Sequence, residues 1–142
     1  MFYGQFENKL DEKNRLMIPK KMREQIGDKI FILEYLDGII SIFNPDEFDK
    51  LAEKANSIPF TQEKARKFAR KIIGSAIDVP VDKMGRIQIP MHYVNKYGIT
   101  KEVIIIGVGN HIEIWNKDEY LSYEEGVDQE FNSIAENLFN NQ

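Results

Sequence analysis

Two arginines, Arg15 and Arg86, are the side chains whose surroundings most clearly suggest a chemical role. Each follows an aspartate by four positions, in the strings Asp11-Glu-Lys-Asn-Arg15 and Asp82-Lys-Met-Gly-Arg86. A guanidinium held beside a tight turn can offer paired N–H groups to a phosphate or to the edge of a guanine. An Asp–Arg pair that only locks the turn accounts for the same residues, since ion pairs at a surface are common and weak. The two roles are compatible, because the aspartate can also hold the arginine in one orientation.

The residues before each arginine have the chemistry of a reverse turn. An aspartate can bond the backbone two residues further on, and Asn14 and Gly85 occupy the same slot, where a positive φ is accepted. Apolar residues alternate before and after each turn, which predicts a β-hairpin in each copy. Pro19 and Pro90 then close the second strand and can open a short helix.

The two arginine strings belong to a longer internal repeat. Beyond the prolines, Phe43-Asn-Pro-Asp-Glu-Phe48 matches Trp115-Asn-Lys-Asp-Glu-Tyr120, and each asparagine is placed to cap a helix. Apolar runs at residues 30–35 and 103–108 predict another strand in each copy, followed by a turn and a returning strand. A unit of four short strands cannot close its own sheet edges. We therefore expect the two copies to interleave in one pseudo-twofold α+β body.

The repeat divides the chain into four segments. They are a first repeat at residues 1–60, a connecting helix at 61–73, a second repeat at 74–125, and a C-terminal helix and tail at 126–142. In the connecting helix, which Thr61 is placed to cap, apolar residues at helical spacing form one side and cations the other. The apolar side is Ala65, Phe68, Ala69 and Ile72, and the cations are Lys64, Arg66, Lys67, Arg70 and Lys71. After Gly126 there is a second apolar stripe at helical spacing, which we expect to pack against another apolar surface. It consists of Val127, Phe131, Ile134, Ala135, Leu138 and Phe139.

Composition limits the classes of function. The net charge is −4, which argues against a generic basic nucleic-acid binder. However, Lys117 is the only cation after Trp115, among many carboxylates. This C-terminal segment accounts for the negative net charge, and the rest of the chain is mildly basic. The chain has no cysteine, which excludes disulfides and thiolate ligands. We expect no membrane span and no export signal, and hence a soluble cytoplasmic protein.

The sequence carries few signs of catalysis. There is no glycine-rich phosphate loop, and His92 and His111 lie at non-equivalent positions of the two repeats without a metal-ligand pattern. The carboxylates Glu124 and Glu125 have no partner placed to act as acid or base. Trp115 is expected in the core. We therefore predict no catalytic residue, no metal and no cofactor.

The string Asp82-Lys-Met-Gly-Arg86-Ile-Gln-Ile-Pro90 resembles the AbrB-type swapped-hairpin DNA-binding signature, and its duplication resembles the MraZ family over nearly the whole chain. The resemblance implies two tandem AbrB-like β-hairpin and helix repeats in one pseudo-twofold, β-barrel-like body with added helices. It implies a bacterial, nucleoid-associated transcriptional regulator that forms ring-shaped homo-oligomers on tandem promoter repeats of double-stranded DNA. The expected target is the promoter of the division and cell-wall gene cluster that includes its own gene.

By that resemblance, the DNA-binding residues fall in the two turns, with one aspartate orienting each arginine. The expected DNA contacts are Lys13, Asn14, Arg15, Lys83, Gly85 and Arg86, and the orienting residues are Asp11 and Asp82. The first turn departs from the usual glycine before the arginine, but Asn14 can adopt the same left-handed conformation. The alternative is an antitoxin-like or scaffold module of the same fold whose partner is a protein. An enzyme is the least supported class.

Overall fold

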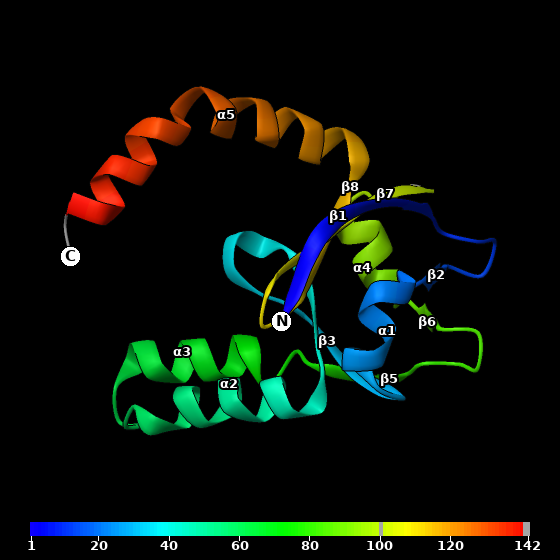
Figure 1. Ribbon diagram of the computed structural model, residues 1–142. Helices are drawn as coiled ribbons and strands as arrows, with labels where there is room; N and C mark the ends of the chain where they lie inside the picture. The colour runs from blue at the N-terminus through cyan, green and yellow to red at the C-terminus, as the bar shows by residue number, and fades with distance from the viewer. Residues whose placement is uncertain (100, 141–142) are drawn as a thin grey trace.

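Strands from the two repeats alternate in one six-stranded antiparallel sheet (Figure 1). The structure is a computed structural model that describes residues 1–99 and 101–140. The first repeat supplies β1 (Phe2–Lys9), β3 (Lys29–Glu34) and β4 (Ile40–Phe43), and the second supplies β5 (Ile77–Pro80), β7 (Glu102–Gly109) and β8 (Ile112–Asn116). Their order across the sheet is β1-β7-β8-β4-β3-β5. A separate two-stranded ribbon pairs β2 (Arg15–Met17) with β6 (Arg86–Gln88).

The strand order has the twofold pseudosymmetry expected from the repeat. When each strand is exchanged for its counterpart in the other repeat, the order of the large sheet simply reverses. The matching central pairs are Ser41 with Glu113 in the large sheet and Leu16 with Ile87 in the ribbon. Both pairs join equivalent positions of the two repeats. The predicted interleaving of the two copies is therefore confirmed.

The hairpin predicted in each copy is closed only at its turn. The N–H of Asp11 donates to the Arg15 carbonyl at 3.0 Å, and that of Asp82 to the Arg86 carbonyl at 2.9 Å. Beyond the turns the strands separate, because β1 pairs with β7 along its full length and β2 pairs with β6. The two strands of each predicted hairpin are thus joined at the turn but pair with strands of the other repeat. Exchange of partners covers strand edges that each unit alone would leave open.

The short helices α1 (Lys20–Ile26) and α4 (Met91–Lys96) follow the two prolines, as predicted. Each presents apolar side chains to a core shared by both repeats. The most buried members of that core, from both repeats, are Leu16, Ile18, Met22, Ile26, Ile30, Ile32, Ile40, Ile42, Ile87, Ile89, Val103, Ile105 and Ile112. The two strands of the ribbon are thereby fixed to the large sheet.

A second apolar cluster lies where α2 (Pro45–Ser57) and α3 (Glu63–Ile72) pack on β3 and β4. Its buried members are Leu33, Phe43, Phe48, Leu51 and Ile72. The Asn44 cap of α2 is confirmed, since its Oδ1 accepts the Glu47 N–H at 2.9 Å. The Thr61 cap of α3 is wrong, because Gln62 precedes the helix and has no side-chain cap bond. Arg66 bonds the carbonyls of Phe60 and Thr61, which holds Thr61 in the preceding loop.

Ion pairs connect α3 to the rest of the body. Glu34, at the end of β3, accepts hydrogen bonds from Lys71 of α3 at 2.8 Å and from Lys96 of α4 at 3.0 Å. Partial burial acts to raise the pKa of Glu34, but hydrogen bonding, Lys71 and Lys96 included, outweighs it and lowers the pKa to about 2. The carboxylate is therefore ionised throughout the physiological range, and α3 is fixed at both β3 and α2.

The last helix, α5 (Lys117–Asn140), begins at the predicted Asn116 cap, whose Oδ1 accepts the N–H groups of Asp118 and Glu119. A separate helix after Gly126 was expected, but α5 runs through this residue unbroken. A single glycine inside a helix costs about 1 kcal/mol relative to alanine, which is too little to end it. No side chain of α5 is buried. Along residues 1–99 and 101–140, none of the helices combines the length and apolar character needed to cross a membrane.

Candidate nucleic-acid interface

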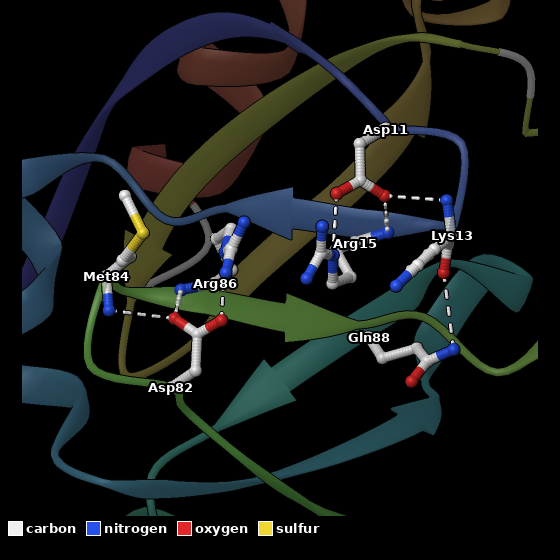
Figure 2. Close-up of polar contacts among 7 residues, drawn as sticks. All are labelled: Asp11, Lys13, Arg15, Asp82, Met84, Arg86 and Gln88. Carbon is white, nitrogen blue, oxygen red and sulfur yellow. Dashed lines mark hydrogen bonds and ion pairs between the residues drawn. The ribbon is translucent and has the colours of Figure 1, made fainter.

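The first turn, residues 11–14, is organised by one carboxylate (Figure 2). Oδ1 of Asp11 accepts the backbone N–H groups of Lys13 at 2.8 Å and Arg15 at 2.9 Å. Oδ2 of the same residue pairs with Nε of Arg15 at 2.6 Å. Asn14 has a φ of 58°, so it adopts the left-handed conformation that its position requires. The aspartate therefore orders the backbone and holds the arginine together.

The second turn, residues 82–85, repeats this arrangement. Oδ1 of Asp82 accepts the N–H groups of Met84 and Arg86, both at 2.9 Å, and its Oδ2 pairs with Nε of Arg86 at 2.8 Å. Gly85 has a φ of 85°. The two sites thus have the same geometry, although their turn residues differ.

Hydrogen bonding lowers the pKa of both aspartates. The largest cause is the backbone N–H of Arg15 for Asp11 and of Arg86 for Asp82, and it outweighs partial desolvation, which raises the pKa. Such a depressed pKa stabilises the fold fully above the unfolded-state value, and that contribution is lost as pH falls through the lower folded-state value. Both carboxylates are therefore ionised at neutral pH.

Pairing of β2 with β6 places both arginines on one outer surface. Leu16 lies opposite Ile87, and both point into the core, so their neighbours point outward. We call this outer surface the arginine face; it consists of Arg15, Met17, Arg86 and Gln88. Figure 2 shows the two guanidinium groups on adjacent strands of the ribbon. The Arg15 side chain is 32% exposed and the Arg86 side chain 27%.

Each aspartate uses only the Nε side of its arginine. Along the described part of the chain, the terminal Nη1 and Nη2 atoms of Arg15 and Arg86 bond no protein acceptor. These atoms form the end of a planar fork that fits two acceptors at once, such as O6 and N7 of guanine or two phosphate oxygens. The arginine face therefore presents two oriented forks with free donors.

Contacts between the repeats fix the two turns relative to each other. The N–H of Ile18 donates to the Gly85 carbonyl and that of Ile89 to the Asn14 carbonyl, both at 2.9 Å. Nε2 of Gln88 also donates to the Lys13 carbonyl at 3.2 Å. Each turn is thus bonded to the strand that follows the other turn.

Arg23 and Gln88 are site residues that sequence reasoning missed. Nε of Arg23 donates to the Ile18 carbonyl at 2.8 Å, and its side chain lies against Gly85 of the second turn. The equivalent position in the second repeat is Val94, so the repeat pattern gave no signal for Arg23. Gln88 faces outward only because of the ribbon pairing.

The predicted site residues lie together at one end of the molecule. Lys13 and Lys83 are exposed in the two turns. Figure 1 shows both turns projecting on the same side, with α2 and α3 at the opposite side. The cations of α3 are therefore remote from the arginine face.

The other candidate residues form no second site. His111 stacks on Phe43 with ring centroids 4.7 Å apart, and burial lowers its pKa, while His92 is exposed beside Tyr93. Trp115 is only partly buried, contrary to expectation, because it packs against Tyr123 of the exposed helix α5. Within residues 1–99 and 101–140, no group of three or more His, Asp or Glu side chains could hold a metal ion.

Comparison with known proteins gives one consistent family. A family model described as "MraZ protein, putative antitoxin-like" matches residues 1–71 and again residues 72–142. Two similar proteins are named "Transcriptional regulator MraZ". That of Caldanaerobacter subterraneus is 39% identical over 140 residues, which cover 99% of this chain and 98% of the relative. That of Oenococcus oeni is 41% identical over 138 residues, which cover 97% and 96% respectively.

Proposed function

The chain belongs to the MraZ family, and on that premise we propose that it is a transcriptional regulator that reads double-stranded DNA with its two turns. The observation that carries the proposal is the pair of guanidinium forks on the arginine face, each oriented by an aspartate and each with free terminal donors. Its relatives' name supports regulation of transcription, and the geometry supports direct contact with a nucleic acid.

Each residue of the site has a distinct role in this proposal. Arg15 and Arg86 bond the edges of guanines in the major groove, where paired donors distinguish guanine from other bases. Lys13 and Lys83, exposed beside them, contact phosphates and position the protein without reading sequence. Asn14 and Gly85 allow the backbone of each turn to curve toward the DNA.

The proposal extends to the target and to assembly. The target is the promoter of the division and cell-wall gene cluster that includes the protein's own gene, and the protein acts in the cytoplasm at the nucleoid. Ring-shaped homo-oligomers bind repeated motifs, so several weak contacts act together. This supports DNA binding by a chain of net charge −4, since each subunit needs to neutralise only a few phosphates. Exposure of the apolar stripe on α5 supports self-association.

A gel shift with the DNA upstream of the protein's own gene tests the reading residues. Arg15→Ala and Arg86→Ala should each weaken specific binding by about 1–3 kcal/mol, the usual value of a bidentate base contact. Lys54→Ala, which removes a cation from α2 far from the turns, is the matched control and should bind normally. Unchanged affinity in both folded arginine variants would show that the turns are only structural.

The antitoxin-like alternative makes a different prediction for the same experiment. A module whose partner is a protein should show no preference for the upstream DNA over unrelated competitor DNA, in the wild type as well as in the variants. The description of the family model favours keeping this alternative. Specific retardation of the upstream fragment, lost in the arginine variants, would exclude it as the main function.

A further inference from the structure

The C-terminal part of α5 presents an apolar surface that the rest of the described chain does not cover. We call this surface the tail stripe; it consists of Val127, Phe131, Ile134, Ala135, Leu138 and Phe139. Phe131 is 58% exposed, Leu138 64% and Phe139 71%. Figure 1 shows the last turns of α5 extending away from both sheets. Exposed aromatic and aliphatic side chains in a row are typical of an interface.

Comparison of the two repeats shows that α5 lacks a covering helix among the described residues. Its counterpart in the first repeat is α2, whose apolar side chains are buried under α3 and the sheet. The residues of α5 equivalent to Phe48 and Leu51 are Tyr120 and Tyr123, and neither is buried. In the described residues, α3 has no counterpart after α5. Among the described residues, the second repeat therefore has no element that covers α5 as α3 covers α2.

The outer surface of α3 has the charge to complement α5. We call this surface the basic face; it consists of Phe60, Lys64, Lys67 and Arg70. Phe60 is 59% exposed, and the guanidinium of Arg70 lies 5.7 Å from the centre of its ring, so the basic face combines apolar area with positive charge. Within α3 only Glu63 is acidic.

The tail stripe is bordered by carboxylates. Asp128, Glu130 and Glu136 are exposed along α5, and its only cation, Lys117, is at the opposite end, where it pairs with Glu7 at 3.3 Å. An acidic helix with an apolar stripe thus stands beside a body that carries a basic, partly apolar helix on another side. Complementary charges of this kind select a partner and its orientation.

We propose that the tail stripe of one copy docks on the basic face of a second copy of the same chain. This inference rests on the self-association that forms part of the proposed function, and it adds which surfaces meet. Because the two surfaces differ, the contact is heterologous, and repetition of one heterologous contact gives a closed ring or an open filament. The basic face is remote from the arginine face, so this assembly leaves both turns free for DNA (Figure 1).

A mixture of two variants, each of which keeps only one of the two surfaces, tests whether the tail stripe contacts the basic face. Deletion of residues 127–142 leaves only the basic face, and Lys64→Glu with Lys67→Glu leaves only the tail stripe. Each variant alone should be monomeric by light scattering, whereas an equimolar mixture should form a one-to-one dimer that cannot grow. A variant with Lys20→Glu and Lys21→Glu, the same charge change on α1, is the control and should assemble as the wild type does.

Charge exchange tests the specific pairing. Asp128→Lys with Glu130→Lys should weaken association by roughly a hundredfold or more, as should Lys64→Glu with Lys67→Glu, because each brings like charges together. All four substitutions in one chain should restore association to within about tenfold of wild type. Circular dichroism would confirm that every variant is folded.

Several results would overturn the pairing. If Lys64→Glu with Lys67→Glu leaves the oligomer intact, α5 packs elsewhere, for example on α5 of another copy. If that variant keeps its assembly but loses affinity for unrelated DNA, the basic face binds DNA instead. Neither result affects DNA reading by the turns, which the arginine variants test separately in the gel shift with the upstream DNA. A monomeric wild type at micromolar concentration would overturn both this pairing and the ring.

Discussion

At the scale of single residues, the decisive feature is that each aspartate binds the Nε atom of its arginine and leaves the terminal Nη1 and Nη2 atoms free of acceptors among the described residues. An exposed arginine without such a partner would sample many rotamers and would lose that freedom on binding. In the proposed function, the pair therefore pre-orients the fork before DNA binds. The aspartate would also place a negative charge near the phosphates, which would disfavour binding without a matching base.

Replacement of Arg15 or Arg86 by lysine should reduce the preference for the specific promoter DNA, which we call the operator. Arg15→Lys and Arg86→Lys keep the positive charge but lose the planar fork. We expect affinity for the operator to fall by about 1–3 kcal/mol, while affinity for unrelated DNA changes little, because a phosphate contact survives. Titrations of both DNAs at one salt concentration would measure this. Full discrimination by the lysine variants would mean that the arginines contact phosphate alone.

Neutralising an orienting aspartate should change the affinity for operator DNA and the affinity for unrelated DNA in opposite directions. Asp82→Asn can still accept backbone hydrogen bonds, but it loses the ion pair with Nε of Arg86. We expect weaker operator binding and stronger binding to unrelated DNA, since a negative charge near phosphate disappears. Competition assays with both DNAs would measure the ratio. Tighter operator binding with discrimination intact would contradict the orienting role.

At the scale of elements, the two turns have the same shape but different constraints. A Cβ on Gly85 would lie 2.5 Å from Nε of Arg23, whereas the first turn accommodates the side chain of Asn14. The second turn is thus closed by a helix of the other repeat, and glycine is needed there for space as well as for its positive φ.

Gly85→Ala should therefore destabilise the protein more than Asn14→Ala. Gly85→Ala bears the full cost of a left-handed alanine, about 1–2 kcal/mol, and also displaces Arg23, whereas Asn14 already has a Cβ, so Asn14→Ala bears only part of that cost. In an Arg23→Ala background, the cost of Gly85→Ala should fall toward that of Asn14→Ala. Urea unfolding of the single and double variants would measure this coupling. Equal costs in both backgrounds would mean that Arg23 moves aside freely.

Turns and helix caps could be predicted from the sequence, because they depend on residues close together in the chain. The strands that pair with one another could be predicted only in part. The Asp–Arg turns and the Asn44 and Asn116 caps follow from residues a few positions apart. The Thr61 cap was wrong because Arg66 holds its loop outside the helix, and a break at Gly126 was wrong because one glycine costs little. The repeat indicated that the copies interleave, but the register that brings Arg15 and Arg86 to one face depends on contacts distant in sequence.

At the scale of the whole molecule, the proposed function implies weak binding to a single DNA motif, because the net charge is −4 and each arginine face has few cations. Two or more repeats bound by linked subunits should raise affinity through effective concentration. The position of the repeats around the double helix then matters as much as their sequence, because every subunit must face its own motif.

Repeat phasing should therefore control binding. An insertion of about 5 bp between two motifs turns the second to the opposite side of the duplex and should abolish the gain, whereas about 10 bp restores the side. Gel shifts with one motif, two phased motifs and two misphased motifs would measure this. Equal affinity for all three DNAs would contradict multivalent binding and leave a single-site regulator or a protein-binding module.

Fusion of the two repeats in one chain permits a difference between them that a symmetric dimer could not have. On the arginine face, Met17 and Gln88 occupy equivalent positions, yet one is apolar and the other can donate and accept hydrogen bonds. A dimer of identical chains reads the same letters in both directions and so favours palindromes. The arginine face is asymmetric in this respect, so if it reads DNA as proposed, it would distinguish the two orientations of a binding motif. Subunits joined head to tail by a heterologous contact would then all point the same way, and they suit motifs repeated in one direction rather than inverted.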